Sequence, residues 1–225
     1  MGLAICVGIP SEVRESDPEY VEYFGQQMEA VNGVLESFGL PEHSEPLDIE
    51  DERTAEFEMY DYSGLHCLRR LAAHLALKGE LPPPGDDEAA SDPVLNDYYR
   101  IFDASFAQGT AAGMPFQHLI VHGDAEGYYL PVEFEDVLIP DASLEIAGGM
   151  LGSSQVLLRE CRELARALEL PEDLSPDDEQ VWSAADTQGE GETKWEQYGV
   201  ESFTCLSLIR ACEASVETGA AVVFA

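Results

Sequence analysis

Short apolar runs near both ends of the chain have the pattern of buried β-strands. Residues 3–9 form one continuous apolar run that Pro10 ends, and residues 220–224 form another. Both runs are short for helices and rich in branched side chains, which favour strands. We therefore expect both ends of the chain to contribute strands to the same sheet.

The clearest strand-turn-strand pattern lies at residues 117–134. In a strand, Leu119 and Val121 would point to one side while His118, Ile120 and His122 point to the other. Residues 123–127 have the composition of a turn, and a second apolar run begins at residue 128. The sequence therefore predicts a central β-hairpin, followed by a short edge strand at 137–139 that a proline ends.

Apolar residues recur every three or four positions in several longer segments, which predicts amphipathic helices. The first begins near Ser16 and Glu19, which have capping-box spacing, and ends at Gly39. Further helices are expected at about 65–79, 92–109, 152–170 and 196–218. A shorter acidic helix is expected at 176–188, with Ser175 as its cap.

Strands that do not alternate regularly with helices indicate the α+β class rather than a doubly wound sheet. We expect a single domain over residues 1–225, in which a small mixed or antiparallel sheet packs against about five helices. This sheet would include both terminal strands and the central hairpin. Residues 82–88, three prolines followed by glycine and three acidic residues, predict a proline-rich surface loop.

The sequence shows no pattern typical of a membrane or secreted protein. No apolar run approaches the roughly 18 residues that span a bilayer, and no basic region precedes the apolar residues 3–9. The five cysteines form no C-x-x-C pair, and each lies within an apolar pattern. We therefore expect a cytoplasmic protein whose cysteines are reduced core residues.

Net charge narrows the classes of partner. The chain has 45 acidic and 11 basic side chains, a formal net charge of -34. A surface this negative repels nucleic acids and anionic membranes, and it attracts basic proteins. The charge can also reflect adaptation of the source proteome, because two lysines against nine arginines suit an acidic, arginine-preferring proteome. The sequence is compatible with both interpretations, attraction of a basic partner and adaptation of the proteome.

His118, His122 and Asp124 are candidate metal ligands, since imidazole and carboxylate groups commonly bind zinc or iron. His66 could supply a further ligand. The alternative is that both histidines lie on a half-buried sheet face while Asp124 forms the turn. Because H-x-x-x-H on a strand is less specific than H-E-x-x-H on a helix, we assign neither a metal nor any other cofactor.

Other polar patterns also have ordinary structural explanations. Arg70, between His66 and His74 on one helix face, could contact an anionic ligand or pair with nearby carboxylates on a solvated face. Residues 148–154 are glycine-rich but lack the lysine of a P-loop. No G-x-S-x-G motif occurs, so no catalytic residue is assigned.

We therefore expect a non-enzymatic acidic protein that inhibits or neutralises a basic protein partner, in the manner of a bacterial toxin immunity protein. The partner would be a toxin or another nucleic-acid-acting enzyme. Alternatives are a metal-dependent enzyme built on the histidine hairpin, with His66 or Arg70, and an acid-adapted domain with no charge-based partner. The candidate partner-binding residues lie in three acidic segments: Asp48, Glu50, Asp51, Glu52, Asp86, Asp87, Glu88, Asp177, Asp178 and Glu179.

Overall fold

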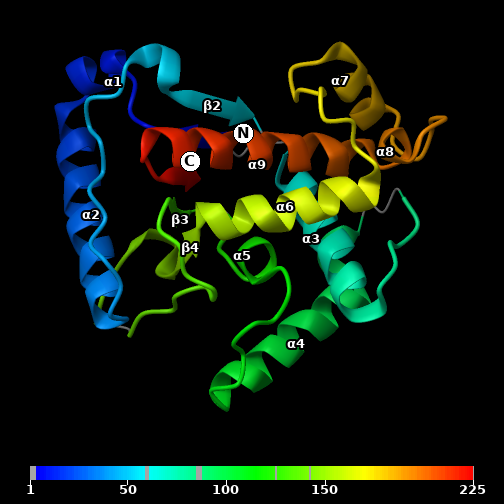
Figure 1. Cartoon of the computed structure of the whole chain (residues 1–225), viewed down its shortest axis with the longest axis horizontal. Coiled ribbons are helices and arrows are strands. Elements are labelled where there is room, and N and C mark those ends of the chain that lie inside the picture. Colours follow the sequence, from blue (N-terminus) through cyan, green and yellow to red (C-terminus); the bar gives the residue numbers. More distant parts are fainter. Residues whose placement is uncertain (1–3, 59–60, 85–87, 125, 142, 225) are drawn as a thin grey trace.

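The computed structural model describes residues 4–58, 61–84, 88–124, 126–141 and 143–224. Within these residues, five strands form one mixed sheet in the order β2-β1-β5-β3-β4 (Figure 1). The pairing of β3 with β4 is parallel, and the other pairings are antiparallel. The strands are β1 (Ala4–Val7), β2 (Ala55–Glu58), β3 (Gly127–Leu130), β4 (Leu151–Ser153) and β5 (Val222–Phe224).

The two terminal strands pair directly with each other. Ile5 lies opposite Phe224, and Val7 lies opposite Val222. On its other edge β5 pairs with β3, so it joins β1 to the central part of the sheet. The predictions of an α+β fold and of one sheet that contains both terminal strands are confirmed.

Six helices in the described part of the chain have eight or more residues, close to the five predicted. They are α2 (Pro18–Ser37), α3 (Asp61–Lys78), α4 (Pro93–Ala107), α6 (Ser154–Leu168), α7 (Glu179–Asp186) and α9 (Gly199–Thr218). The shorter helices are α1 (Ser11–Ser16), α5 (Gln117–Ile120) and α8 (Lys194–Gln197), with 3-10 turns η1 (Asp51–Arg53), η2 (Ala89–Ser91) and η3 (Ala147–Gly149).

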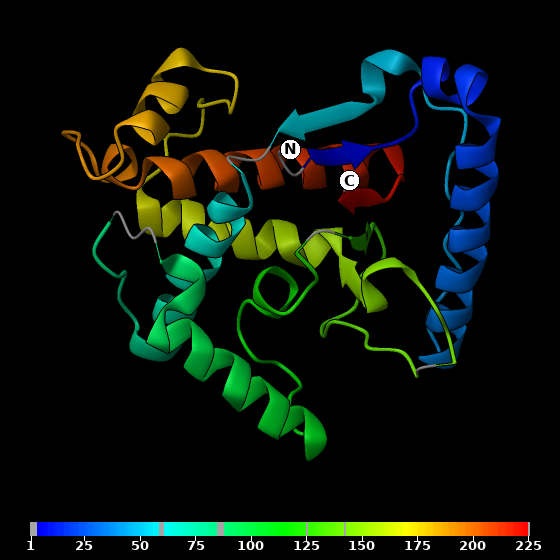
Figure 2. The ribbon, with the colours of Figure 1, turned by 180° about the vertical axis from the view of Figure 1, so that it is seen from behind.

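Different helices cover the two faces of the sheet. Along β3, Tyr129 packs into the core formed with α3, α6 and α9, whereas Tyr128 and Leu130 pack with Phe24 and Val31 of α2. This alternation is the period of two that a strand imposes. Figures 1 and 2 show α2 along one edge of the molecule, with α6 and α9 side by side across its centre. One side of α2 is thus buried and the other faces solvent.

Aspartate side chains cap the starts of α2 and α4, but two predicted caps are wrong. Asp17 caps α2 by accepting a hydrogen bond from the Tyr20 N–H at 3.0 Å, in place of the predicted Ser16 and Glu19 capping box. The N-cap residue of α7 is Asp178 rather than Ser175, because the chain stays extended at Asp178. The start predicted for α4 is confirmed: its cap is Asp92.

The first half of the predicted central hairpin is wrong. Gln117–Ile120 form α5, and all four of its side chains are buried, so they do not alternate between two faces. Glu160 accepts hydrogen bonds from the His118 and Leu119 N–H groups, at 3.2 and 2.8 Å. Arg69 donates to the Leu119 carbonyl at 2.8 Å. These two distant side chains satisfy the ends of a helical turn, which the local alternation could not reveal.

Two further boundaries differ from the predictions. Residues 137–139 do not form an edge strand: Leu138 makes one isolated antiparallel bridge to Leu151. The last helix is interrupted at Tyr198, between α8 and α9. A Cβ atom at Gly199 would overlap the Ala184 carbonyl, so glycine lets the start of α9 pack closely against α7.

The proline-rich segment is attached to the core at its start. Pro82 is buried, and its carbonyl accepts a hydrogen bond from the Tyr198 hydroxyl at 2.6 Å. Pro83 is exposed, while its carbonyl accepts a hydrogen bond from Arg70 at 3.1 Å. Residues 85–87 lie outside the described residues, so the loop predicted at 82–88 stays a prediction for that part.

Candidate functional site

Most of the few basic side chains are already paired with carboxylates. Among the described residues, nine of the eleven basic side chains form ion pairs: Arg14, Arg53, Arg69, Arg70, Arg100, Arg159, Arg162, Lys194 and Arg210. The 45 acidic side chains far outnumber them. The excess negative charge therefore lies on carboxylates at the surface, where it can attract cations.

Helix α2 presents a row of carboxylates on the side away from the sheet. Glu22, Glu29 and Glu36 are exposed and recur every seven residues, while Phe24 and Val31 are buried. Seven residues advance a helix by about 10.5 Å, so the row spans about 21 Å. The helix contains neither lysine nor arginine. Its solvent side is therefore a straight, negative ridge.

The loop between α2 and β2 is fixed beside α2. Asn32 of α2 accepts a hydrogen bond from the His43 N–H at 2.8 Å and donates one to the His43 carbonyl at 2.9 Å. His43 also pairs with Glu45 at 2.6 Å, and both side chains are buried. Figures 1 and 2 show this loop running along the length of α2. The loop therefore holds its own carboxylates beside the α2 row.

Helix α1 fixes the far end of the same loop. Arg14 donates to the carbonyls of Leu47 and Ile49 and forms an ion pair with Asp48 at 3.3 Å. Ser11 binds the Asp51 carboxylate through its N–H, at 2.8 Å, and through its hydroxyl. The two bonds from Ser11 lower the pKa of Asp51, so this carboxyl stays charged to lower pH.

The first predicted acidic segment thus joins the ridge of α2 in one surface. Its four predicted residues are all exposed. We call the combined surface the α2 acidic face, and it consists of Glu12, Glu15, Glu19, Glu22, Glu29, Glu36, Glu42, Asp48, Glu50, Asp51 and Glu52. The residues from α1 and α2 were not predicted, although the seven-residue spacing of glutamates was visible in the sequence.

The described residues of the other two predicted segments do not belong to this surface. Asp177 and Glu179 are exposed, while Asp178 is half-buried and accepts a hydrogen bond from the Ser175 N–H at 2.8 Å. Figure 1 places α7, which these residues precede or begin, on the opposite side of the molecule from α2. Glu88 is exposed just before η2. Asp86 and Asp87 lie outside the described residues.

His118 and His122 are buried side chains that bind the backbone. The Nδ1 atom of His118 accepts from the Ser153 N–H at 2.9 Å, so Nε2 carries the proton and donates to the Glu135 carbonyl at 3.1 Å. The His122 Nε2 atom lies 3.2 Å from the Tyr128 carbonyl. Burial lowers the pKa of His118 to about 4 and that of His122 to about 3. Both rings are therefore neutral near pH 7.

The candidate metal ligands do not come together in one site. In the described ranges, no group of three or more histidine, cysteine, aspartate or glutamate side chains is placed to hold a metal ion. Asp124 instead forms an ion pair with Arg69, whose side chain is almost fully buried. His66 is near the same carboxylate, with its Nε2 atom 3.7 Å from Asp124. The negative charge of Asp124 therefore offsets the positive charge of the buried Arg69 guanidinium group.

Sequence reasoning missed Arg69, although a signal for it exists. Leu65, Leu68 and Ala72 are buried at the spacing of one helix face, and Arg69 lies on that face among them. An arginine on a buried apolar face needs hydrogen-bond or ion-pair partners that are buried with it. It finds them in the carbonyls of Leu119, His122 and Gly123, at the end of α5.

Arg70 and His74 do not lie on a solvated helix face. The Arg70 Nε atom is 3.0 Å from the Asp92 carboxylate, and both side chains are buried. His74 contacts the same carboxylate at 3.1 Å. Asp92 also accepts from the Val94 and Leu95 N–H groups, so it caps α4. This cluster connects α3 to α4, and its ion pair is the pairing of Arg70 with a carboxylate that the sequence offered as the alternative to anion binding.

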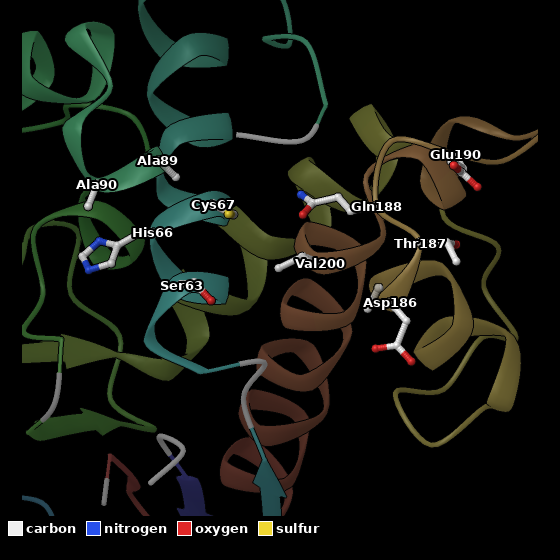
Figure 3. A pocket seen from close by; sticks show the side chains of 11 residues that line it. Ser63, His66, Cys67, Ala89, Ala90, Asp186, Thr187, Gln188, Glu190 and Val200 are labelled. Atoms are coloured by element: carbon white, nitrogen blue, oxygen red, sulfur yellow. The ribbon is translucent and has the colours of Figure 1, made fainter. Parts of the chain in front are cut away.

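A cavity of about 740 Å³ lies between α3, η2 and the turn that follows α7. Its polar lining includes His66, Asp186, Gln188 and Glu190. Figure 3 shows the side chains of His66, Asp186 and Glu190 pointing in different directions rather than toward a common point. Acid–base or nucleophilic catalysis needs groups that converge on one reacting atom. The lining of this cavity does not have that arrangement.

The structure also bears on the predicted state of the cysteines and on the apolar character of the helices. The five cysteines all lie in the described ranges and form no disulfide bond, and Cys67, Cys161, Cys205 and Cys212 are buried, as predicted for core residues. In the part of the chain that the structure describes, no helix is long and apolar enough to cross a membrane.

The sequence was also compared with known proteins. No curated protein and no solved structure matches the chain. Residues 1–224 do match a protein family, and its description reads "Putative DNA-mimic protein". Because that match includes every element from β1 to β5, the protein belongs to this DNA-mimic family.

Proposed function

We propose that this protein binds a DNA-binding protein and blocks its DNA site, with carboxylates in the places that phosphates would occupy. The observation that carries the proposal is the α2 acidic face, a rigid surface of exposed carboxylates on a member of a DNA-mimic family. The function is non-enzymatic, and the partner is a basic protein rather than DNA. Its specific form is inhibition of a toxin or another nucleic-acid-acting enzyme, as an immunity protein does.

The length of the α2 row suits a surface that normally binds DNA. Glu22, Glu29 and Glu36 span about 21 Å, which is close to the rise of six base pairs of B-DNA at about 3.4 Å each. The loop beside α2 adds Asp48, Glu50 and further carboxylates next to this row. Lysines and arginines of the partner that normally neutralise several phosphates at once would meet several carboxylates on the α2 acidic face.

Rigidity supports the same function. A disordered acidic segment must lose conformational entropy when it binds, which weakens the complex. The Asn32 bonds to His43 and the Arg14 bonds to Leu47 and Ile49 hold the loop in place before any partner arrives. The surface charge would also accelerate encounter with a basic groove by electrostatic steering.

The first experiment is capture of host proteins on the immobilised protein, followed by elution with a short DNA duplex. A DNA-binding protein that the duplex releases, in equal stoichiometry with the bait, is the expected result. Purified complex should then bind no DNA through that partner. A partner that DNA does not displace would contradict the mimicry, and the identity of the partner decides whether the protein is an immunity protein.

A matched pair of variants tests where the partner binds. The triple variant Glu22→Gln, Glu29→Gln, Glu36→Gln should lower affinity about tenfold at low salt, if each carboxylate contributes roughly 0.5 kcal/mol. The control is Glu172→Gln, Asp177→Asn, Glu179→Gln, which removes the same charge from exposed positions near α7. Equal loss in both variants would mean that net charge alone acts, as in an acid-adapted domain.

A further inference from the structure

A second surface feature is an apolar groove between the C-terminal ends of α2 and α4. It encloses about 400 Å³, within the roughly 300–1,000 Å³ typical of binding pockets. Side chains from α4 and from the loop after β3 form its floor, including Phe102, Phe134 and Leu138. Figure 1 shows the ends of α2 and α4 toward the same lower side of the molecule.

Two phenylalanines at the edge of this groove are exposed to an unusual degree. Phe38 is 48% exposed and Phe106 is 50% exposed. The Phe38 backbone is held at the end of α2, where its N–H bonds to the Val34 and Leu35 carbonyls, and the Phe106 ring stacks on Phe102 at a centroid distance of 5.9 Å. Exposed aromatic surface beside an apolar hollow is typical of interaction sites.

The charge around the groove defines the chemistry of its occupant. Glu135 is exposed and lines the groove together with Asp136, and no lysine or arginine lines it. Asp136 is fixed, because its carboxylate accepts from the Gly113 N–H at 2.8 Å and from Gln117 at 2.9 Å. An occupant that complements this groove has an apolar group at its centre and positive charge beside it.

We propose that the groove binds a leucine- or phenylalanine-sized side chain that the DNA-binding partner presents between arginines or lysines. This proposal rests on the proposed function and adds a contact that DNA itself could not make. Stable interfaces combine a polar rim with a few buried apolar anchors. The groove supplies an anchor site whose contribution is not screened by salt, unlike the contribution of the α2 acidic face.

Two labelled hexapeptides test the proposal with the full-length protein. One has two arginines on each side of a Leu-Phe pair, and the other has two arginines on each side of an Ala-Ala pair. Fluorescence anisotropy should show about tenfold tighter binding of the Leu-Phe peptide, the factor expected for burying one such side chain. Amide shifts measured by NMR should concentrate at groove residues such as Phe106 and Phe134.

The variants separate the groove from other exposed surfaces. Phe106→Ala should abolish the difference between the peptides, and Phe38→Ala provides an independent second test. Ile101→Ala, which removes a 41% exposed side chain from the same helix outside the groove, should leave the difference unchanged. Glu135→Gln should weaken both peptides and preserve their ratio.

Three results would overturn the groove proposal. The first is equal binding, or no binding, of the two peptides. The second is a difference that persists in Phe106→Ala and Phe38→Ala while circular dichroism shows intact folds. The third is concentration-dependent dimerisation that these variants abolish, because the occupant would then be a second copy of the chain. The capture experiment and the α2 variants would still test the proposed function, since neither experiment depends on the groove.

Discussion

Arg69 and Glu160 bind opposite ends of the same helical turn, α5. The Glu160 carboxylate accepts from the N–H groups of His118 and Leu119, while Arg69 donates to carbonyls at the other end. A hydrogen-bond acceptor at the start and a donor at the end of a helical turn satisfy its unpaired backbone groups. The turn is thereby fixed, and with it Gln117, which lines the apolar groove.

The protonation of Glu160 predicts a pH dependence of stability. Burial raises the pKa of Glu160 from 4.5 to about 8. Between these values the folded protein keeps a proton that the unfolded chain has released, so this group lowers the free energy of unfolding as pH rises. The decrease is at most about 1.4 kcal/mol per pH unit. Urea unfolding of wild type and Glu160→Gln across this range should show the stability of the wild type falling relative to the variant.

The control for this measurement is Glu172→Gln, which changes an exposed carboxylate shortly after the same helix. Its stability should follow the wild-type pH curve. If the curve of Glu160→Gln also stays parallel to that of the wild type, Glu160 does not hold a proton in the folded state.

Asp92 should be a major contributor to stability. It pairs with buried Arg70 and caps α4 through Val94 and Leu95. Asp92→Ala should lower the free energy of unfolding by about 3–5 kcal/mol, because it removes both the carboxylate that pairs with buried Arg70 and the cap of α4. Asp97→Ala, which breaks an exposed pair with Arg100, should cost under about 1 kcal/mol. Chemical denaturation measures both, and equal losses would contradict the role given to burial.

Two glycine substitutions should have effects of opposite sign. Gly199→Ala would place a methyl group against the Ala184 carbonyl and should destabilise the protein by about 1–3 kcal/mol. Gly25→Ala, inside α2 where a Cβ meets no neighbour within 4 Å, should stabilise it by roughly 0.5–1 kcal/mol. Thermal unfolding monitored by circular dichroism compares the two. A tolerated Gly199→Ala would mean that α7 and α9 can separate without loss.

Binding of the captured partner should depend strongly on salt. Screening shortens the range of the charges on the α2 acidic face to about 8 Å at physiological ionic strength. Stopped-flow measurements should show the association rate falling at least about tenfold from low to physiological salt, with a smaller change in the dissociation rate. An association rate that salt does not change would remove the electrostatic basis of the proposed function.

The parts of the fold that sequence predicted are those with local causes. Helices α2, α4 and α6 have apolar residues at helical spacing and polar residues near their starts, so their positions followed from short windows. The terminal strands were likewise visible as short apolar runs. In contrast, the state of Gln117–Ile120 depends on Arg69 and Glu160, which are 40 or more residues away in sequence.

The sequence predicted the negative charge of the candidate site but not the positions of its carboxylates in the fold. Composition marks Asp48 and Asp177 equally as exposed acids, and only the fold places the first beside α2 and the second near α7. The hydrogen bonds that fix the loop join Asn32 to His43 and Arg14 to Leu47, pairs without a recognisable motif. His118 and His122 were noticed for their chemistry, although burial makes them neutral structural groups.

The central position of β5 affects the order in which the protein can fold. Ile5 finds its partner Phe224 only after translation has reached the end of β5, and until then β1 and β3 have no strand between them. Unpaired strand edges promote aggregation, and contacts between distant residues form slowly. Repulsion between nascent chains this acidic keeps such open edges apart during synthesis. The charge that suits a DNA mimic thus also protects the unfinished sheet.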